Sequence, residues 1–332
     1  MKLENVPLVS IIVITYNSSK YVLETLESAK AQTYQNIELI VSDDCSTDDT
    51  IEVCQNWLNK NEERFVRTEL LTVSQNTGIP ANCNRGYKAA KGEWIKGIAG
   101  DDVLVNTAIQ NYVLAITSNT VFLVGQIQPF NIDKNRMIIL KDIDPEKYHL
   151  KFFDLSASQQ HKYLLTKSFN FAPSVFLKKC LFEKYGTFNE KYKFIEDLPY
   201  WLHLTSCNIK FDYLPIVTVF YRTGHESMVF SNEHFFNIKF YNCLYLFRTS
   251  IIYPQIPIWN ISFYQSELFE RICYYIIVNI FKNKKTKITK ILYKVFCNLR
   301  INTILYKLKR GINSISTGTQ GVHDKKSSEN SK

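Results

Sequence analysis

Four short segments of apolar, mostly β-branched residues alternate with helical patterns over the first hundred residues of this 332-residue chain. They lie at residues 8–15, 37–42, 70–73 and 94–99. A continuous apolar run of this length is typical of a strand that is buried on both faces, as in a parallel sheet. The stretches between these runs have the apolar spacing of helices. Strand and helix in alternation, with short connections, predict an α/β fold with a doubly wound, mostly parallel sheet.

The middle of the chain continues this pattern less regularly. We expect a helix at residues 106–118 and a strand at 121–126, followed by loops and short helices over 131–167. Pro173 interrupts an apolar segment at 169–176, and proline is confined mainly to edge strands, so we expect an edge strand or a loop wall there. A helix is expected to end at Gly186 and another to begin near Pro199, and closing strands are expected at 211–213 and 217–221.

The C-terminal region differs from the rest in charge. Eleven Lys or Arg and no Asp or Glu occur between Arg271 and Arg310, whereas the whole chain has a net charge of +9. Apolar residues from Ile288 to Leu308 repeat at spacings of three and four with lysines between them, which predicts a basic amphipathic helix. Such a helix either lies in the interface of an anionic membrane or packs its apolar face on the rest of the protein, and the lack of acids favours the membrane. No apolar run reaches the ~20 residues of a membrane span, and the charge pattern does not require nucleic acid.

These features predict three regions. They are an α/β domain at residues 1–230, a helical, basic and amphipathic region at 231–312, and a disordered tail at 313–332 that is rich in Ser, Lys and Asn. The eight cysteines lack CxxC spacing, and no secretory signal opens the chain, which indicates free thiols in a reducing compartment. We therefore expect a cytoplasmic protein that is peripheral on the inner face of the cell membrane.

Polar residues gather where the predicted strands end. In chain order they are Thr15, Tyr16, Asn17, Asp43, Asp44, Asp101 and Asp102. Ligands of doubly wound sheets bind beyond the carboxyl ends of the strands. The chain has neither GxGxxG nor GxxxxGK[ST], so a dinucleotide fold and a P-loop are disfavoured. Paired carboxylates predict instead a Mg²⁺ or Mn²⁺ ion shared with phosphates of the ligand, and a plain turn with both acids in water is the alternative for Asp101 and Asp102.

Six stretches resemble, in order and spacing, the motifs of family 2 glycosyltransferases, which are inverting nucleotide-sugar enzymes with the GT-A fold. The stretches are residues 9–17, 40–48, 76–93, 100–102, 196–201 and 221–227. Gly100-Asp101-Asp102 is similar to the metal-binding DxD motif, and Glu196-Asp197 followed by Trp201 is similar to the catalytic block. The resemblance covers residues 7–230, and residues 231–312 would be a helical, basic extension of the GT-A domain.

The resemblance implies a role for individual residues. The nucleotide-sugar would be bound by Thr15, Tyr16, Asn17, Asp43, Asp44, Asn76 and Asp101, with Asp43 accepting a hydrogen bond from a uracil N–H. A Mn²⁺ or Mg²⁺ ion would be held by Asp101 and Asp102, with His225 as a further ligand, and Asp197 would be the general base. Three positions depart from the family pattern: Ala99 stands where an acid is common, Cys45 where glycine is usual and Cys83 where arginine is common. The missing acid at position 99 puts strong metal dependence in question.

The implied reaction is a single inverting displacement at the anomeric carbon of a nucleotide-sugar, expected to be a UDP-sugar. Asp197 would take the proton of the acceptor hydroxyl, and its neighbour Glu196 is the competing candidate. The acceptor is expected to be a lipid-linked glycan in the synthesis of O-antigen, capsule or another surface polysaccharide. Two other functions stay open: a non-catalytic nucleotide- or sugar-binding protein on a degenerate GT-A fold, and a nucleotidyltransferase.

Overall fold

The computed structural model describes residues 6–133, 136–140, 142–224 and 233–305. Its contacts divide the chain into two compact units. The first consists of Met1–His225 and Asn242–Gln255, and the second of Glu226–Tyr241 and Ile256–Lys332. The predicted metal ligand His225 and the predicted disordered tail at 313–332 lie outside the described residues.

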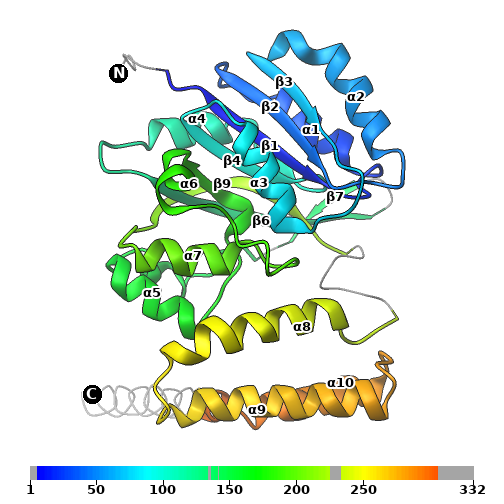
Figure 1. Cartoon of the computed structure of the whole chain (residues 1–332), viewed down its shortest axis with the longest axis vertical. Helices are drawn as coiled ribbons and strands as arrows, with labels where there is room; N and C mark the ends of the chain where they lie inside the picture. Colours follow the sequence, from blue (N-terminus) through cyan, green and yellow to red (C-terminus); the bar gives the residue numbers. More distant parts are fainter. Residues whose placement is uncertain (1–5, 134–135, 141, 225–232, 306–332) are drawn as a thin grey trace, which may run out of the picture. The chain divides into compact units, whose positions relative to one another are not determined.

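The first unit is built on a nine-stranded sheet whose N-terminal half is parallel (Figure 1). Strands β1 (Val9–Thr15), β2 (Ile37–Asp43), β3 (Arg67–Leu71) and β4 (Trp94–Ala99) stand in the order β3-β2-β1-β4. Helices α1 (Val22–Lys30), α2 (Thr50–Asn61) and α3 (Ile79–Ala89) follow β1, β2 and β3 in turn. The predicted alternation of strand and helix is confirmed, and the carboxyl ends of these parallel strands meet at one edge of the sheet.

Different helices cover the two faces of this parallel half. On one face, Ile11 and Val13 of β1 belong to a buried core that includes residues of α1, α2 and α4 (Ala108–Leu114). On the other face, α3 approaches β1 so closely that a Cβ added at Gly86 would lie 2.5 Å from Cγ2 of Ile12. Because helices pack on both faces, the sheet is doubly wound, as expected.

The second half of the sheet is mixed. β8 (Val175–Lys178) runs antiparallel to both β4 and β6 (Phe122–Asp133). β9 (Asp212–Arg222) is parallel to β6, and β5 (Val103–Leu104) is antiparallel to β9. β7 (Arg136–Ile139) pairs with β6 outside this order.

The expectation of an edge strand or loop wall at residues 169–176 holds for 169–174, which form a loop and a short turn, and is wrong for Val175 and Phe176, which begin a central strand. β8 lies between β4 and β6, in the interior of the sheet. Pro173 does not conflict with this position because it belongs to a short 3₁₀ turn, Ala172–Ser174, that precedes the strand. Its missing N–H therefore removes no hydrogen bond from the ladder.

Other boundaries differ less. Helix α4 is shorter than the expected 106–118, and the two expected closing strands are one continuous strand, β9. Residues 131–167 hold the end of β6, strand β7 and helix α5 (Ala157–Thr166). Helix α6 (Cys180–Tyr185) ends at Gly186, which has a φ of +85°, and helix α7 (Asp197–Ser206) carries Pro199 in its first turn, both as expected.

The helical C-terminal extension is confirmed. It comprises α8 (Ile238–Phe247), α9 (Ile261–Tyr275) and α10 (Lys287–Asn298), and a π-helical turn, Ile276–Ile280, follows α9. Shorter helical turns are Glu62–Arg64, Leu150–Phe152, Arg248–Ile252 and Tyr253–Gln255. Over the residues that the structure describes, no helix combines the length and the apolar character needed to cross a bilayer.

Candidate active site

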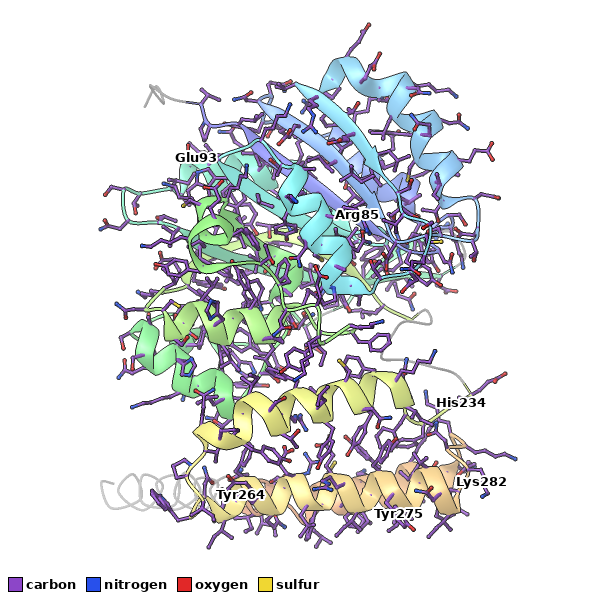
Figure 2. The ribbon with its side chains drawn as sticks, viewed as in Figure 1. Arg85, Glu93, His234, Tyr264, Tyr275 and Lys282 are labelled. Carbon is purple, nitrogen blue, oxygen red and sulfur yellow. The ribbon has the colours of Figure 1, made fainter. Side chains whose placement is uncertain are left out.

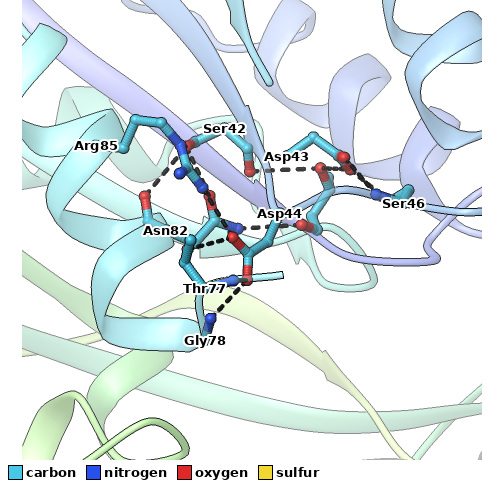
Figure 3. Close-up of polar contacts among 9 residues, drawn as sticks. Ser42, Asp43, Asp44, Ser46, Thr77, Gly78, Asn82 and Arg85 are labelled. Carbon is cyan, nitrogen blue, oxygen red and sulfur yellow. Dashed lines mark hydrogen bonds and ion pairs between the residues drawn. The ribbon is translucent and has the colours of Figure 1, made fainter. Parts of the chain in front are cut away.

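Asp43 holds together the loops that follow β1 and β2. Its carboxylate accepts hydrogen bonds from Oγ1 of Thr15 at 2.8 Å, from the backbone N–H of Ser46 at 2.7 Å and from Oγ of Ser46 at 2.5 Å (Figure 3). Asp43 has no exposed surface. The structure thus brings Asp43 and Thr15 together, as partners of each other and of the turn that leads into α2. A contact between Asp43 and a uracil N–H stays a prediction, and it would have to replace part of this buried network.

Asn17 joins the same two loops from the surface. Its backbone N–H donates to Oγ of Ser46 at 2.8 Å, and its Oδ1 accepts a hydrogen bond from the backbone N–H of Thr47 at 2.8 Å. Its φ of +50° lies in the left-handed region, which Asn tolerates better than most residues. Tyr16, beside it, is 46% exposed, so its ring offers a flat face at the strand end on which a nucleobase could stack.

The unusual cysteine at position 45 occupies a strained backbone conformation. Cys45 has a φ of +65°, a region that glycine enters without steric cost. A residue with a Cβ pays about 1–2 kcal/mol there. The backbone geometry of this turn explains why glycine is usual at the position in the family that the sequence resembles.

Asp44 is a second anchor at the carboxyl end of β2, and it binds the loop that precedes α3 (Figure 3). Its carboxylate accepts hydrogen bonds from the backbone N–H groups of Thr77 at 2.9 Å and Gly78 at 2.8 Å. It also forms an ion pair with Arg85 of α3 at 3.0 Å. Gly78 has a φ of +97°, which permits the tight turn at the start of α3. Asn76 is exposed immediately before this network, so Asn76 and Asp44 belong to one loop cluster.

Arg222, the last residue of β9, holds the Asp101–Asp102 turn. Its backbone N–H donates to Oδ1 of Asp102 at 2.9 Å, and its Nε donates to the carbonyl oxygen of Asp101 at 2.8 Å. Its Nη2 pairs with Glu24 of α1 at 2.7 Å. The guanidinium carbon lies 4.5 and 4.7 Å from the centroids of two aromatic rings, so stacking adds to these polar contacts. Arg222 therefore fixes both the backbone and one carboxyl group of the acidic pair.

The electrostatics of the acidic pair suit a divalent cation. Asp102 is 1% exposed, and its burial, together with the negative charge of Asp101, raises its pKa well above the usual range. Two carboxyl groups this close ionise together readily only beside a positive charge. One or two carboxylates with phosphate oxygens are a ligand set that Mg²⁺ accepts, so the pair fits the ion. Among the described residues, no cluster of three or more His, Cys, Asp or Glu side chains is arranged to hold a metal without such phosphate ligands.

The acidic turn lies against the end of β1. The backbone N–H of Gly100 donates to the carbonyl oxygen of Ile14 at 2.9 Å. A Cβ added at Gly100 would lie 2.8 Å from Cγ2 of Thr15, so the turn and the predicted nucleotide residue are in close contact. Ala99, where the family often has an acid, is exposed at the end of β4. A longer side chain at position 99 would therefore extend into solvent near the pair.

Glu196 and Asp197 form a second acidic pair at the N-terminus of α7. Burial and the charge of Asp197 raise the pKa of Glu196 to about 8. Burial also raises the pKa of Asp197, but its own backbone N–H and that of Leu198 favour its charged form, whereas Glu196 has only its own. Backbone donors thus favour the charged form of Asp197 more than that of Glu196. A general base at Asp197 needs the charged form, so these hydrogen bonds favour Asp197 over Glu196 for that role.

Cys83 of α3 links the second acidic pair to the loop cluster around Asp44. Burial raises the pKa of its thiol well above the usual range, and the negative charges of Glu196, Asp197 and Asp44 raise it further. These three carboxyl groups thus lie within electrostatic range of one buried thiol, although they come from distant parts of the chain. The segment before α7 is also hydrogen-bonded to the first residue of α3.

Arg222, Arg85 and Lys96 support the site. Arg85 and Arg222 lie within the stretches 76–93 and 221–227 that resemble the family motifs, but the sequence assigns no role to either of them, and Lys96 falls within none of the six stretches. Lys96 is fully buried in β4, and its Nζ donates to the carbonyl oxygen of Pro173 at 2.5 Å. Burial lowers the pKa of Lys96 to about 7, against the attraction of the nearby Asp102 carboxyl group. For Lys96, the available signal is a lysine inside an otherwise apolar strand, where charged residues are rare.

Comparisons with known proteins identify the family of the chain. Residues 10–186 match the family model described as glycosyl transferase family 2. The chain is 30% identical over 234 residues to the Escherichia coli protein named UDP-Glc:alpha-D-GlcNAc-diphosphoundecaprenol beta-1,3-glucosyltransferase WfaP, an alignment that covers 68% of this chain and 81% of the relative. It is also 36% identical over 109 residues to Escherichia coli chondroitin synthase, covering 32% of this chain and 15% of that much longer relative.

Solved structures support the fold. The crystal structure of S. aureus TarS 1-349 in complex with UDP-GlcNAc matches with a TM-score of 0.53 at 18% identity, covering 87% of this chain and 79% of that chain. Identity this low is evidence for a shared fold and for nothing finer. Together with the family match, it agrees with the mixed α/β sheet and its helical extension.

Proposed function

The chain belongs to glycosyl transferase family 2 and has the GT-A fold, and from this premise we propose that it transfers a sugar from a UDP-sugar to an acceptor hydroxyl with inversion at the anomeric carbon. The observation that carries the proposal is the position of the acidic pair Glu196–Asp197. Both carboxyl groups and that of Asp44, which lies in the loop after β2, are within electrostatic range of the buried thiol of Cys83. A candidate general base thus lies near the strand-end residues that would bind the donor.

The proposed chemistry is a single displacement. The acceptor oxygen bonds to the anomeric carbon while its proton passes to the carboxylate of Asp197. The bond from that carbon to the diphosphate oxygen breaks, and its electron pair leaves with the nucleoside diphosphate. General-base assistance of this kind contributes about 10²–10⁴-fold to the rate. Because Glu196 is still protonated, it places no second negative charge beside the base.

The donor would lie across the carboxyl ends of β1, β2 and β4. Tyr16 offers a stacking face for the base, and the loops tied by Asn17 shape its surroundings. Asp101 and Asp102 would hold a Mn²⁺ or Mg²⁺ ion, which supplies positive charge at the departing diphosphate. Arg222 keeps this acidic pair in place.

The acceptor is proposed to be a lipid-linked glycan, and the product a surface polysaccharide such as O-antigen or capsule. The support is the family relative whose name specifies a diphosphoundecaprenol-linked acceptor. A lipid-linked acceptor is presented at a membrane, so we place the enzyme on the inner face of the cell membrane, with its basic C-terminal helices on anionic lipid.

A donor screen tests the transferase proposal. The full chain is incubated with UDP-, GDP- and dTDP-sugars and lipid-linked acceptors in detergent with Mn²⁺, and nucleotide release and the anomeric configuration of the product are measured. Release from a UDP-sugar, a product of opposite configuration and loss of both in D197N are the expected results. UDP binding in titration calorimetry without turnover on any donor would favour the non-catalytic alternative, which the missing acid at position 99 motivates.

A further inference from the structure

The exposed apolar residues of the second unit form one continuous face. On α9, Ile261, Leu268, Ile272 and Tyr275 are 70%, 53%, 39% and 65% exposed. On α10 and its C-cap, Ile288, Ile291, Val295 and Leu299 are 62%, 63%, 46% and 50% exposed. Their spacings of three, four and seven residues put each set in one row along its helix. Tyr275, for example, projects outward from α9 (Figure 2).

The two rows lie on the same side of the helix pair. α9 and α10 run antiparallel, because Gln265 bonds to Leu299 at one end and Phe269 contacts Phe296 one turn further in. At about 100° per residue, each row lies roughly a quarter to a third of a turn from this contact line, in the same sense along its own helix. In an antiparallel pair, equal rotation in the same sense brings both rows to one face. We call it the apolar face of the second unit.

Aromatic residues cover another side of the same helix pair. Tyr274 of α9 stacks on Tyr241 with ring centroids 3.7 Å apart and contacts Phe236 at 5.3 Å. Tyr293 of α10 contacts Phe235 at 5.4 Å. The helix pair therefore has an internal apolar contact of its own in addition to the exposed apolar face. An exposed apolar surface of this extent marks an interaction site.

A row of lysines runs beside the apolar face. Lys287, Lys290 and Lys294 of α10 are exposed and repeat at spacings of three and four, about a quarter of a turn from the apolar row. Residues 271–310 contain no acid, so the surface of α10 carries one sign of charge, whereas α9 also contains Glu267 and Glu270. An anionic lipid surface attracts each lysine of this row, whereas a protein partner does not require a row of like charges beside an apolar patch.

We propose that α9 and α10 lie side by side in the interface of an anionic bilayer, with the apolar face toward the acyl chains and the lysine row at the headgroups. The inference rests on the proposed membrane-facing transferase and specifies which residues make the contact. Ile258 and Trp259, which precede α9, are 84% and 79% exposed and add apolar surface next to the start of this helix. Trp is favoured at the boundary between headgroups and acyl chains.

Trp259 makes the geometry directly measurable. The other three tryptophans, Trp57, Trp94 and Trp201, are 6%, 1% and 4% exposed, so Trp259 alone is positioned to sense lipid. Vesicles of phosphatidylcholine and phosphatidylglycerol should shift its emission to the blue, and brominated lipid should quench it. W259F should lose both signals. Unchanged emission of the native chain on these vesicles would overturn the proposal.

Paired variants test the apolar face by vesicle sedimentation of the full chain. I291S/V295S should weaken binding at least about tenfold, because binding strength scales with buried apolar area. L114S is the matched control: Leu114 is 61% exposed on α4 of the first unit, and its loss should leave binding unchanged. Thermal unfolding checks that all variants fold. Equal binding of the paired variant and the control contradicts the proposal, as does a dimer in solution that I291S/V295S converts to monomer, since the face would then cover a second copy.

Charge reversal tests the lysine row. K287E/K290E/K294E should abolish binding to phosphatidylglycerol vesicles, and salt should weaken binding of the native chain. K60E, at an exposed position of α2, should bind these vesicles as the native chain does. Nucleotide release with a detergent-solubilised acceptor should be unchanged in all these variants. Turnover without vesicle binding refutes this inference and leaves the transferase proposal standing. Vesicle binding without turnover on any donor supports this inference and refutes the transferase proposal.

Discussion

Replacing Glu196 by Gln probes the acidic pair at the start of α7. Burial and the charge of Asp197 raise the pKa of Glu196 from 4.5 to about 8. A carboxyl group with a raised pKa binds its proton more tightly in the folded than in the unfolded chain. Its contribution to stability is therefore fully present below about pH 4.5 and is lost as the pH rises toward about 8. A glutamine has nearly the same shape and no charge, so E196Q should lack this loss.

The expected size of the effect follows from the raised pKa. Each pH unit above the usual value of 4.5 costs the folded state about 1.4 kcal/mol until the pH reaches about 8. At pH 7 the sum is about 3 kcal/mol, an upper bound because Glu196 keeps some exposure. Urea unfolding of the native chain and of E196Q should therefore give similar free energies near pH 4.5 and a growing advantage for E196Q between pH 5 and 8.

The control and the refuting outcome are equally specific. E52Q removes a charge at an exposed position of α2 and should not reproduce the pH-dependent advantage. Free energies of unfolding that run parallel for the native chain and E196Q from pH 4.5 to 8 would refute the assignment of the proton to Glu196. The comparison is internal, so other groups that titrate in this range, such as Lys96, cancel between the two proteins.

Activity separates the two acids, and three other perturbations test the rest of the site. At pH 7, kcat of E196Q should stay within about tenfold of the native value while D197N loses about 10²–10⁴-fold; the opposite ranking would make Glu196 the base. D101A should lose turnover and the response of activity to Mn²⁺. Activity of D101A that still rises with Mn²⁺ would show that Asp101 is not a metal ligand. A99D, which adds an exposed acid beside the pair, should lower the Mn²⁺ concentration for half-maximal activity, and an unchanged concentration would show that position 99 does not reach the ion. R222M removes a nearly buried guanidinium that donates to the carbonyl oxygen of Asp101 and pairs with Glu24, and it should lower the free energy of unfolding by about 1.5–3 kcal/mol. E24Q, whose side chain is 48% exposed, should cost about 1 kcal/mol or less, and equal losses would show that the buried contacts of Arg222 do not stabilise the turn.

The parallel half of the fold is readable from the sequence because burial on both faces leaves little freedom of composition. Val9 to Val13 and Ile37 to Val41 are nearly unbroken apolar runs, and their strands begin and end within a residue of the prediction. β3 is the exception. It starts at Arg67, three residues before the expected 70, because an edge strand tolerates charge: Arg67 pairs with Glu38 of β2 at 2.8 Å. A strand whose buried contact is an ion pair leaves no periodic apolar pattern in the sequence.

The position of the candidate site residues at the strand ends was predictable from the sequence, but the partners of these residues were not. Acids and hydroxyls at strand ends are a local signal, and it indicated Thr15, Asp43 and Asp101. Arg222 is separated by 121 residues from Asp101 and by 198 from Glu24, and only the closing of β9 onto the sheet brings them together. The burial of Asp43 is likewise a property of the assembled loops and not of its own segment. Long-range pairing of this kind leaves no periodic trace in the chain.

The C-terminal helices show what amphipathicity alone leaves undecided. A stripe of apolar residues with interleaved lysines is consistent both with a helix packed on its own protein and with a helix lying on lipid. In the structure α10 has two apolar surfaces. One, with Phe296 and Tyr293, contacts α9 and Phe235, which precedes α8, and the other, with Ile291 and Val295, is exposed. The internal contact already satisfies the packing requirement of the helix pair. The proposed contact with an anionic lipid surface rests on this second apolar surface and on the row of lysines beside it.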